Sequence, residues 1–323
     1  MKALAARHWF LFTLAGLITI GIVFAAQLKP IADHMPHRIV TAAVLFVMSL
    51  PLDGSSMWAA LRRPTAVLTA TGVNFLFVPM AAWGTSRLLE GDLGLGLLII
   101  ASAPSTLASA AVWTRRAGGN DAVAILVTML TRLICFLVTP GLLELMTGQE
   151  VQLDVLDMIV KLALVAVLPI FAAQLLRQNG AVADWATRRK PALGMLGQCG
   201  ILSLVLVGVI RAGLKLARPE LQISLADWLL MIAAVIGVHL VGFVAGHLLA
   251  RALGVSRPDR IAVGFSGSQK TLPIALEVAN MPVYGGLTVL PVVTYHVAQL
   301  LVDTVLADRL KARTPESSPS DTA

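Results

Sequence analysis

Long apolar runs recur along the whole chain, and they constrain its fold more than any other feature. The hydrocarbon core of a bilayer needs about 20 mostly apolar residues per helix. Ten such runs predict an all-α integral membrane protein with ten transmembrane helices: 9–26, 39–60, 64–88, 93–114, 121–147, 155–176, 192–210, 225–250, 258–279 and 283–307. Charged residues make up 13% of the 323-residue chain, against about 25% in soluble domains. This composition excludes a soluble enzyme, a disordered protein and a nucleic-acid-binding module.

The basic residues between the runs predict how the chain is oriented. If the ten runs cross alternately, 16 of the 25 Lys and Arg residues lie on the side of the N-terminus, and six lie on the opposite side. Cytoplasmic loops of membrane proteins are enriched in Lys and Arg. We therefore expect a multi-pass protein of the plasma (inner) membrane, surrounded by the lipid bilayer, with both termini in the cytoplasm.

The runs divide into two halves of five, residues 1–150 and 151–310, followed by a tail at 311–323 that is expected to be a disordered cytoplasmic segment. An odd number of spans in each half predicts two inverted repeats. The fourth run of each half is interrupted, at 103–106 and at 266–271, by Pro, Gly and polar residues that favour unwinding. Paired interruptions in inverted halves indicate the binding site of a secondary transporter, and kinks without function are the alternative.

Five short motifs, in this order along the chain, carry a resemblance to a known family. They are Asn-Phe-Leu-Phe-Val-Pro at 74–79, the segment 104–109, Gly-Gly-Asn-Asp at 118–121, Thr-Pro at 139–140 and Gly-Ser-Gln-Lys-Thr-Leu-Pro at 267–273. They resemble helices three, four, five and nine of the bile acid:sodium symporter superfamily. The Gly-Gly-Asn-acid and Gly-Ser-x-Lys-[Ser/Thr]-Leu runs resemble its sodium/bile-acid-cotransporter-like orphan branch (SBF-like). The match extends over nearly the whole chain.

The resemblance implies an architecture and a mode of action. Spans 3–5 and 8–10 would form a core domain, and spans 1, 2, 6 and 7 would form a panel domain. Broken helices 4 and 9 would cross near the ion sites. Organic anions would then be moved across the membrane by alternating access.

The sequence departs from the sodium-coupled members of that family at the positions of their ion ligands. A helix-nine Glu, which those members share between two sodium sites, aligns with Gly264. The other aligned ligand positions hold Asn74, Ser109, Ala110, Ala124, Thr128 and Ser268. Because the strongest ligand is missing, a sodium site is doubtful. No other metal site and no cofactor are expected, since no His, Cys or carboxylate cluster has transition-metal spacing.

Lys270, between Gln269 and Thr271, is the residue most expected to carry the mechanism. A cation inside a span costs several kcal/mol by insertion scales, so it indicates function by default. Lys270 lies in the segment where the family places sodium, and its ammonium could neutralise backbone carbonyls and helix C-termini in place of that ion. It could also gain and lose a proton during the cycle. The alternative is a lysine that reaches the membrane interface with its long side chain.

Polar residues of the fourth and fifth runs have two interpretations each. Ser105, Thr106 and Ser109 cluster around the first interruption, where they could ligate an ion or substrate, or cap free backbone groups. Arg132 lies midway along the fifth run, and it could pair with a buried carboxylate such as Asp303 or bind an anionic substrate with its fork of donors. Both alternatives stay open for each group.

His296, Gln299 and Asp303 fall at positions i, i+3 and i+7 of the last run. This spacing predicts that the three side chains share one helical face. A polar stripe on a membrane helix is expected to face the protein interior. It could form a proton relay or a partner for Lys270, or it could form hydrogen bonds that only hold the helices together.

These patterns favour a secondary transporter of a small organic anion, in which Lys270 replaces a sodium ion. One alternative is a conventional sodium-coupled symporter of organic, bile-acid-like anions. Another is a membrane regulator of ion homeostasis that transports nothing. Sodium or a proton could be the coupling ion. An enzyme is not expected, because no Ser-Lys, Asp-Asp or His-Glu-x-x-His arrangement has the needed spacing. Neither the substrate nor the oligomeric state follows from the sequence.

Overall fold

The computed structural model describes residues 9–52, 64–148, 154–218, 223–281 and 283–312. Within these segments all regular secondary structure is helical. Part of the second predicted span, 53–60, and most of the predicted tail, 313–323, lie outside the described residues. The last described residues, up to Ala312, belong to a helix.

Six described helices are long and apolar enough to cross a membrane, or seven if one bent pair counts as a single span. The six are Pro64–Ser86, Asp121–Thr147, Val155–Arg177, Lys190–Leu216, Leu225–Ala252 and Gly286–Ala312. The described part of the chain is therefore all-helical, and the chain is a multi-pass membrane protein. The count of ten spans and the inverted repeat remain predictions.

The first predicted span is bent rather than continuous. Helix α2 (Trp9–Val23) meets α3 (Ala25–His34) at an angle of 107°. Phe24, between them, has φ −105° and ψ 26°, outside the helical region. The expectation of one run over 9–26 is thus wrong at its end, and the chain continues through α3 to α4 (His37–Ser49). No Pro or Gly occupies position 24, so the sequence carried no local signal for this bend.

Two of the long helices contain a π-helical segment that ends two residues before a proline. In the first, α6 (Pro64–Gly72) and α7 (Val78–Ser86) flank η1 (Val73–Phe77), and Pro79 follows η1. In the second, α11 (Val155–Leu162) and α12 (Leu168–Arg177) flank the π-helical segment η3 (Ala163–Val167), and Pro169 follows η3. π-helical turns are rare and occur frequently at functional sites.

The two predicted interruptions are present as helix breaks. Helix α8 (Gly91–Ser102) is separated from α9 (Leu107–Arg116) by the four residues 103–106, and Ala103 is extended. Helix α16 (Arg257–Ser268) ends before extended Gln269, and α17 (Leu272–Ala279) follows. The second break is shorter than predicted, because residues 266–268 stay helical. A 12-residue helix is about 18 Å long, too short for a hydrocarbon core of about 30 Å.

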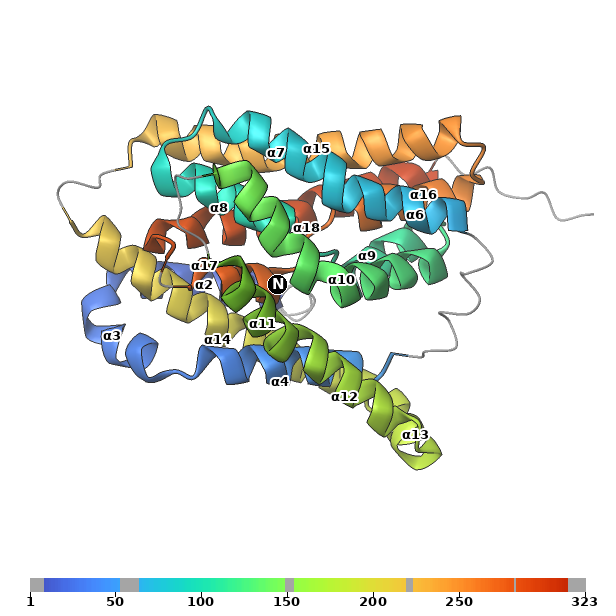
Figure 1. The fold of residues 1–323 in the computed structure, drawn as a ribbon, viewed down its shortest axis with the longest axis horizontal. Coiled ribbons are helices and arrows are strands. Elements are labelled where there is room, and N and C mark those ends of the chain that lie inside the picture. Colours follow the sequence, from blue (N-terminus) through green and yellow to red (C-terminus); the bar gives the residue numbers. More distant parts are fainter. Residues whose placement is uncertain (1–8, 53–63, 149–153, 219–222, 282, 313–323) are drawn as a thin grey trace, which may run out of the picture.

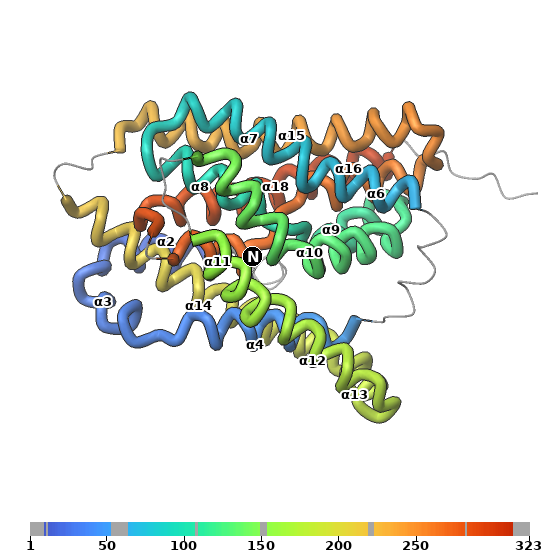
Figure 2. Tube along the Cα trace, in the orientation of Figure 1, coloured from blue at the N-terminus to red at the C-terminus, as the bar shows by residue number. Residues whose placement is uncertain are grey.

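The helices pack in two groups, which Figure 1 and Figure 2 show as a lower and an upper layer. In the lower group, α14 (Lys190–Leu216) packs against α2, α3 and α4, and α12 packs against α4 and the short α13 (Gly180–Arg188). We call these helices, with α11, the α14 group.

The upper group surrounds the two helix breaks. Helix α15 (Leu225–Ala252) packs against α16, α7 and α18 (Val289–Ala312), and α10 (Asp121–Thr147) packs against α9, α16 and α6. We call the helices α6 to α10 and α15 to α18, which include both breaks, the α15 group. The two groups meet where α14 contacts α17, the 3-10 turn η5 (Gly286–Thr288) and α18, where α4 contacts α17, and where α10 contacts α11.

Candidate functional site

The ammonium of Lys270 lies at the centre of the α15 group and is fully buried. Its Nζ donates to the carbonyl oxygen of Asn74 at 2.5 Å and to that of Ala103 at 3.0 Å. The ring centroid of Phe75 lies 5.7 Å from the same nitrogen. Among the described residues, no carboxylate forms an ion pair with it. Lys270 therefore does not reach the membrane interface, and backbone oxygens surround its charge.

Both carbonyls are available for a physical reason. In the π-helical turn η1, the amide of Val78 donates to Val73, five residues back. The next amide in that pattern would belong to residue 79 and would donate to Asn74, but Pro79 has no N–H. Ala103 directly follows the last turn of α8, whose C-terminal end carries partial negative charge. Lys270 satisfies an oxygen at each place.

The side chain of Asn74 caps the broken end of α16. Its Nδ2 contacts the carbonyl oxygens of Gly267 and Gln269 at 3.1 Å each, and that of Ser266 at 3.4 Å. The remaining carbonyl, Ser268, accepts from the hydroxyl of Tyr295 at 2.9 Å. The carbonyls freed by this break are therefore all bound by side chains.

The side chain of Gln299 binds the backbone of the extended segment. The amide of Lys270 donates to Gln299 Oε1 at 2.9 Å, and Gln299 Nε2 donates to the carbonyl of Lys270 at 3.0 Å. The same Nε2 lies 2.9 Å from His296 Nδ1. Of the predicted polar stripe on α18, Gln299 thus meets the crossing segment at the backbone of Lys270 rather than at its ammonium, and His296 contacts Gln299.

Asp303, the third member of the stripe, is fully buried in a network of neutral and titratable side chains. Its Oδ1 lies 2.8 Å from His239 Nε2, and its Oδ2 accepts from Gln269 Nε2 at 2.5 Å. Gln269 Oε1 in turn accepts from Ser109 at 2.7 Å. The network therefore joins α18, α15, the second break and α9.

Arg132 does not pair with Asp303, which corrects one of the two expectations for it. Its Nη2 donates to the hydroxyl of Thr271 at 3.1 Å, and the carboxylate of Asp303 is bound by His239 and Gln269 instead. Helix α10 places Arg132 beside the second break, whereas Asp303 faces α15. Sequence spacing alone does not fix such a distance between two helices.

The hydroxyls around the first break bind backbone and each other. Thr128 Oγ1 lies 3.1 Å from the carbonyl oxygen of Thr106, and Thr106 Oγ1 lies 3.0 Å from Ser109 Oγ. The amide of Ser105 donates to Thr131 Oγ1 at 3.2 Å. These contacts match the capping interpretation of the polar cluster.

The residues present do not fit the sodium site that the resemblance implies. At Gly264, in place of the family's Glu, a Cβ atom would lie 2.9 Å from the ring of Phe243, so a longer side chain has no room. The aligned oxygen donors of Ser109, Thr128 and Ser268 already bind protein atoms, Ser268 Oγ donating to Gly264 at 2.9 Å. The aligned Asn74 amide binds carbonyls.

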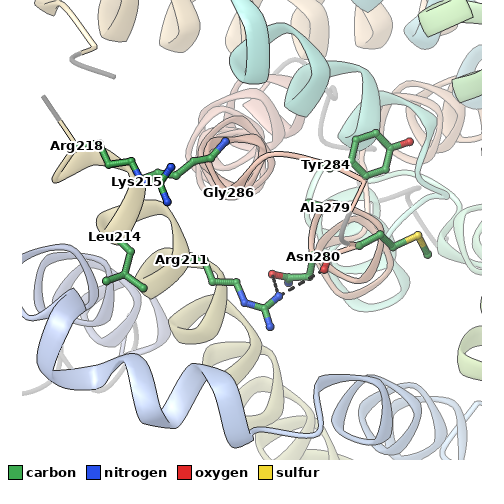
Figure 3. Close-up of a pocket in the computed structure, with 9 residues that line it drawn as sticks. Arg211, Leu214, Lys215, Arg218, Ala279, Asn280, Tyr284 and Gly286 are labelled. Atoms are coloured by element: carbon green, nitrogen blue, oxygen red, sulfur yellow. Dashed lines mark hydrogen bonds between the residues drawn. The ribbon is translucent and has the colours of Figure 1, made fainter. Parts of the chain in front are cut away.

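A second polar region lies where the two helix groups meet. Figure 3 shows Arg211 extending from α14 toward Asn280, at the end of α17, beside a cavity of about 290 Å³. Arg211 Nη1 donates to Asn280 Oδ1 at 3.1 Å, and Lys215 Nζ donates to Asp92 Oδ2 of α8 at 2.7 Å. These contacts tie the α14 group to the α15 group at the end predicted to face outside.

Sequence reasoning passed over two residues of the central site. It assigned neither His239 nor Tyr295 to the site, although both contact the carbonyl of Ser268. Tyr295 is one of two tyrosines in the chain and lies next to His296 inside an apolar run, which was the available signal.

Comparisons with known proteins identify the family of the chain. A family model described as "SBF-like CPA transporter family (DUF4137)" matches residues 8–312. "Uncharacterized protein PA2026" of Pseudomonas aeruginosa is 30% identical over 275 residues, which cover 83% of this chain and 80% of that protein. "Sodium/bile acid cotransporter 7" is 23% identical in Xenopus tropicalis, over 95% of this chain and 92% of that protein, and 23% identical in Mus musculus, over 95% and 94%.

Proposed function

The chain belongs to the SBF-like CPA transporter family, and on that basis we propose that it is a secondary transporter that moves a small organic anion by alternating access. Membership makes it a membrane transporter rather than an enzyme. We propose also that the protein lies in the plasma (inner) membrane with both termini in the cytoplasm. The curated cotransporter relatives, which this chain matches over nearly their full length, favour an organic anion as the substrate class.

In this proposal the α14 group is the panel domain and the α15 group is the core domain. The crossing breaks lie within the α15 group, so a substrate bound there would move with that group relative to α14. The contacts of Arg211 with Asn280 and of Lys215 with Asp92 would hold the two groups together on one side. Release of these contacts would accompany opening toward that side.

We propose further that Lys270 acts as a fixed cation in place of sodium. The observation that carries this proposal is the buried ammonium bound to the carbonyls of Asn74 and Ala103. A sodium ion at a helix break would likewise bind oxygen atoms and balance the partial negative charge of helix C-termini. The absence of space beside Gly264 for an acidic ligand supports the same conclusion.

The second candidate is coupling to sodium, which the printed names of the cotransporter relatives favour. For this candidate, the hydroxyls of Ser109, Thr128 and Ser268, which donate their hydrogens to protein oxygens, would have to bind the ion with their lone pairs and without the family's acidic ligand. Proton coupling requires no such ion site, and the candidate pair for it is Asp303 and His239, whose side chains meet at 2.8 Å in the interior.

The coupling ion is tested by the melting temperature of the purified protein in sodium and in choline at equal ionic strength. A ligand that binds only the folded state raises this temperature. We expect equal values in the two salts for the wild type and a clear fall for Lys270→Met in both. The matched control is Lys161→Met, because Lys161 is partly exposed and pairs with Asp157 on its own helix. A rise of the wild-type value in sodium alone would overturn the fixed-cation proposal and favour sodium coupling.

Transport itself is tested in proteoliposomes with two carboxylates of different size, pyruvate and glycocholate. We expect uptake of at least one of them above the level of protein-free liposomes, driven by its own gradient without sodium. If both stay at that background level, the proposed substrate class is wrong.

A further inference from the structure

Among the described residues, Arg132 is the buried charged group with the most unpaired polar atoms. Its side chain, on α10, is only 2% exposed. One nitrogen, Nη2, donates to the hydroxyl of Thr271, and the other two, Nε and Nη1, have no hydrogen-bond partner among the described residues. Buried polar groups in native proteins are nearly always paired, so an exception requires an explanation.

The free donors form a geometry that suits one chemical group. A guanidinium has five N–H donors, and the bond to Thr271 uses one of the two on Nη2. Whichever Nη2 hydrogen it uses, a complete pair of parallel donors remains, on Nε and Nη2 or on Nη1 and Nη2. Such a pair binds the two oxygens of a carboxylate.

The charge of Arg132 is also uncompensated within the described part of the chain. The carboxylate of Asp303 binds His239 and Gln269, and the buried acid Glu277 lies 3.5 Å from Arg38 of the α14 group. Lys270 adds a second buried cation, which carbonyls surround. A buried charge without its counter-charge is strongly unfavourable, so the site favours an incoming anion.

The position of Arg132 lies at the junction of the two breaks. Thr271, its partner, donates its amide to the carbonyl of Pro104 at 2.9 Å. The amide of the next residue, Ser105, donates to the hydroxyl oxygen of Thr131, the chain neighbour of Arg132. Ser105 Oγ is itself buried without a partner among the described residues. The unpaired donors of Arg132 therefore lie beside the hydrogen bonds that join the two helix breaks.

We propose that Arg132 is the anion anchor of this transporter and binds the carboxylate of the substrate with its free donor pair. The inference rests on the proposed function and specifies its substrate class: an organic carboxylate with one charge at the anchored end. Lys270 then holds the helix breaks together, and Arg132 holds the cargo. The fixed cation and the substrate-binding cation are separate residues.

The experiment measures the melting temperature with pyruvate, with glycocholate below its critical micelle concentration, and with the uncharged amide of each. We expect a carboxylate, but not its amide, to raise the wild-type value. Arg132→Gln should weaken the apparent affinity about ten- to a hundredfold, the range for a bond to a charged group. Arg132→Lys should retain part of the response. The control Arg87→Gln, at an exposed arginine stacked on Trp83, should keep all of it.

The anion-free measurement separates binding from a structural role. A structural arginine would leave Thr271 unsupported when removed, and Arg132→Gln would melt clearly below the wild type. An anchor awaiting its anion predicts an equal or higher melting temperature for Arg132→Gln, because an uncompensated buried charge is removed.

The outcomes are distinguishable. A fall of the anion-free value, or an undiminished carboxylate response in Arg132→Gln, would overturn the anchor while leaving the transporter intact. No response and no uptake of either carboxylate in the wild type would count against the proposed function itself.

Discussion

The backbone amide of Thr271 donates a hydrogen bond to the carbonyl oxygen of Pro104 at 2.9 Å, so the two helix breaks satisfy each other. A break leaves backbone groups without helical partners, which is costly where no water can reach them. Here each break supplies part of what the other lacks, and Lys270, Asn74 and Gln299 supply the rest. The crossing is therefore a joint that both halves of the chain must form together.

Replacing Asn74 by Leu is expected to destabilise the joint. The substitution leaves carbonyls of Gly267 and Gln269 buried without their donor, and each such loss costs about 1–3 kcal/mol. A clear fall of the melting temperature in detergent is expected. The control Asn179→Ala removes an exposed helix cap, worth about 1 kcal/mol. Equal effects of the two variants would show that the Asn74 contacts contribute nothing specific.

Asp303 and His239 are expected to act as a unit. Their side chains meet at 2.8 Å in the interior, so Asp303→Asn and His239→Phe should show a coupling energy of about 0.5–3 kcal/mol in a double-mutant cycle. Denaturation of the four proteins in the same detergent measures it. A second cycle of Asp303→Asn with Asn179→Ala should be additive within about 0.5 kcal/mol, since distant sites do not couple. Additivity in both cycles would contradict the contact.

Gly96 is expected to tolerate no side chain. A Cβ atom there would overlap the carbonyl oxygen of Thr288 and the ring of Pro291, so Gly96→Ala must push α8 away from α18. We expect a loss of about 1–3 kcal/mol, typical of overpacking. Gly84→Ala is the matched control, because a Cβ at that helical position meets nothing within 4 Å. It should stabilise the protein by up to about 1 kcal/mol through helix propensity.

The pair α8 and α9 is expected to cross the membrane as one span. Neither helix is long enough alone, and the basic residues place Arg87 outside and Arg115 and Arg116 inside. Alkaline phosphatase fused after Arg87 should be active, and the same enzyme fused after Arg116 should be inactive, with fluorescent-protein fusions giving the opposite pattern. Equal activity at the two positions would make the pair a re-entrant loop.

The helix breaks could be predicted from sequence, and most of their contacts could not. Pro104 and the segment 267–273 interrupt otherwise apolar runs, and the breaks occur at those places. The bend at Phe24 had no such marker. Likewise, the sequence shows the charge of Lys270 but not the carbonyl oxygens that bind it. Every residue has a carbonyl, and only the fold determines which carbonyls lack a helical partner.

The partners of Arg132 illustrate the same limit. Two buried ionisable groups of opposite sign invite pairing on charge alone, and Asp303 was the obvious candidate. In the fold, α15 brings His239 to Asp303, and the second break brings Thr271 to Arg132. Tertiary packing thus gives the carboxylate of Asp303 a different partner from Arg132.

The proline at position 79 makes two distant positions dependent on each other. Any other residue there would carry an amide that competes with the Lys270 ammonium for the oxygen of Asn74. The π-helical turn and Lys270 therefore depend on each other, although they lie in two separate segments of the chain. An engineer who wishes to restore an ion requirement in this protein would have to redesign positions 79 and 270 together.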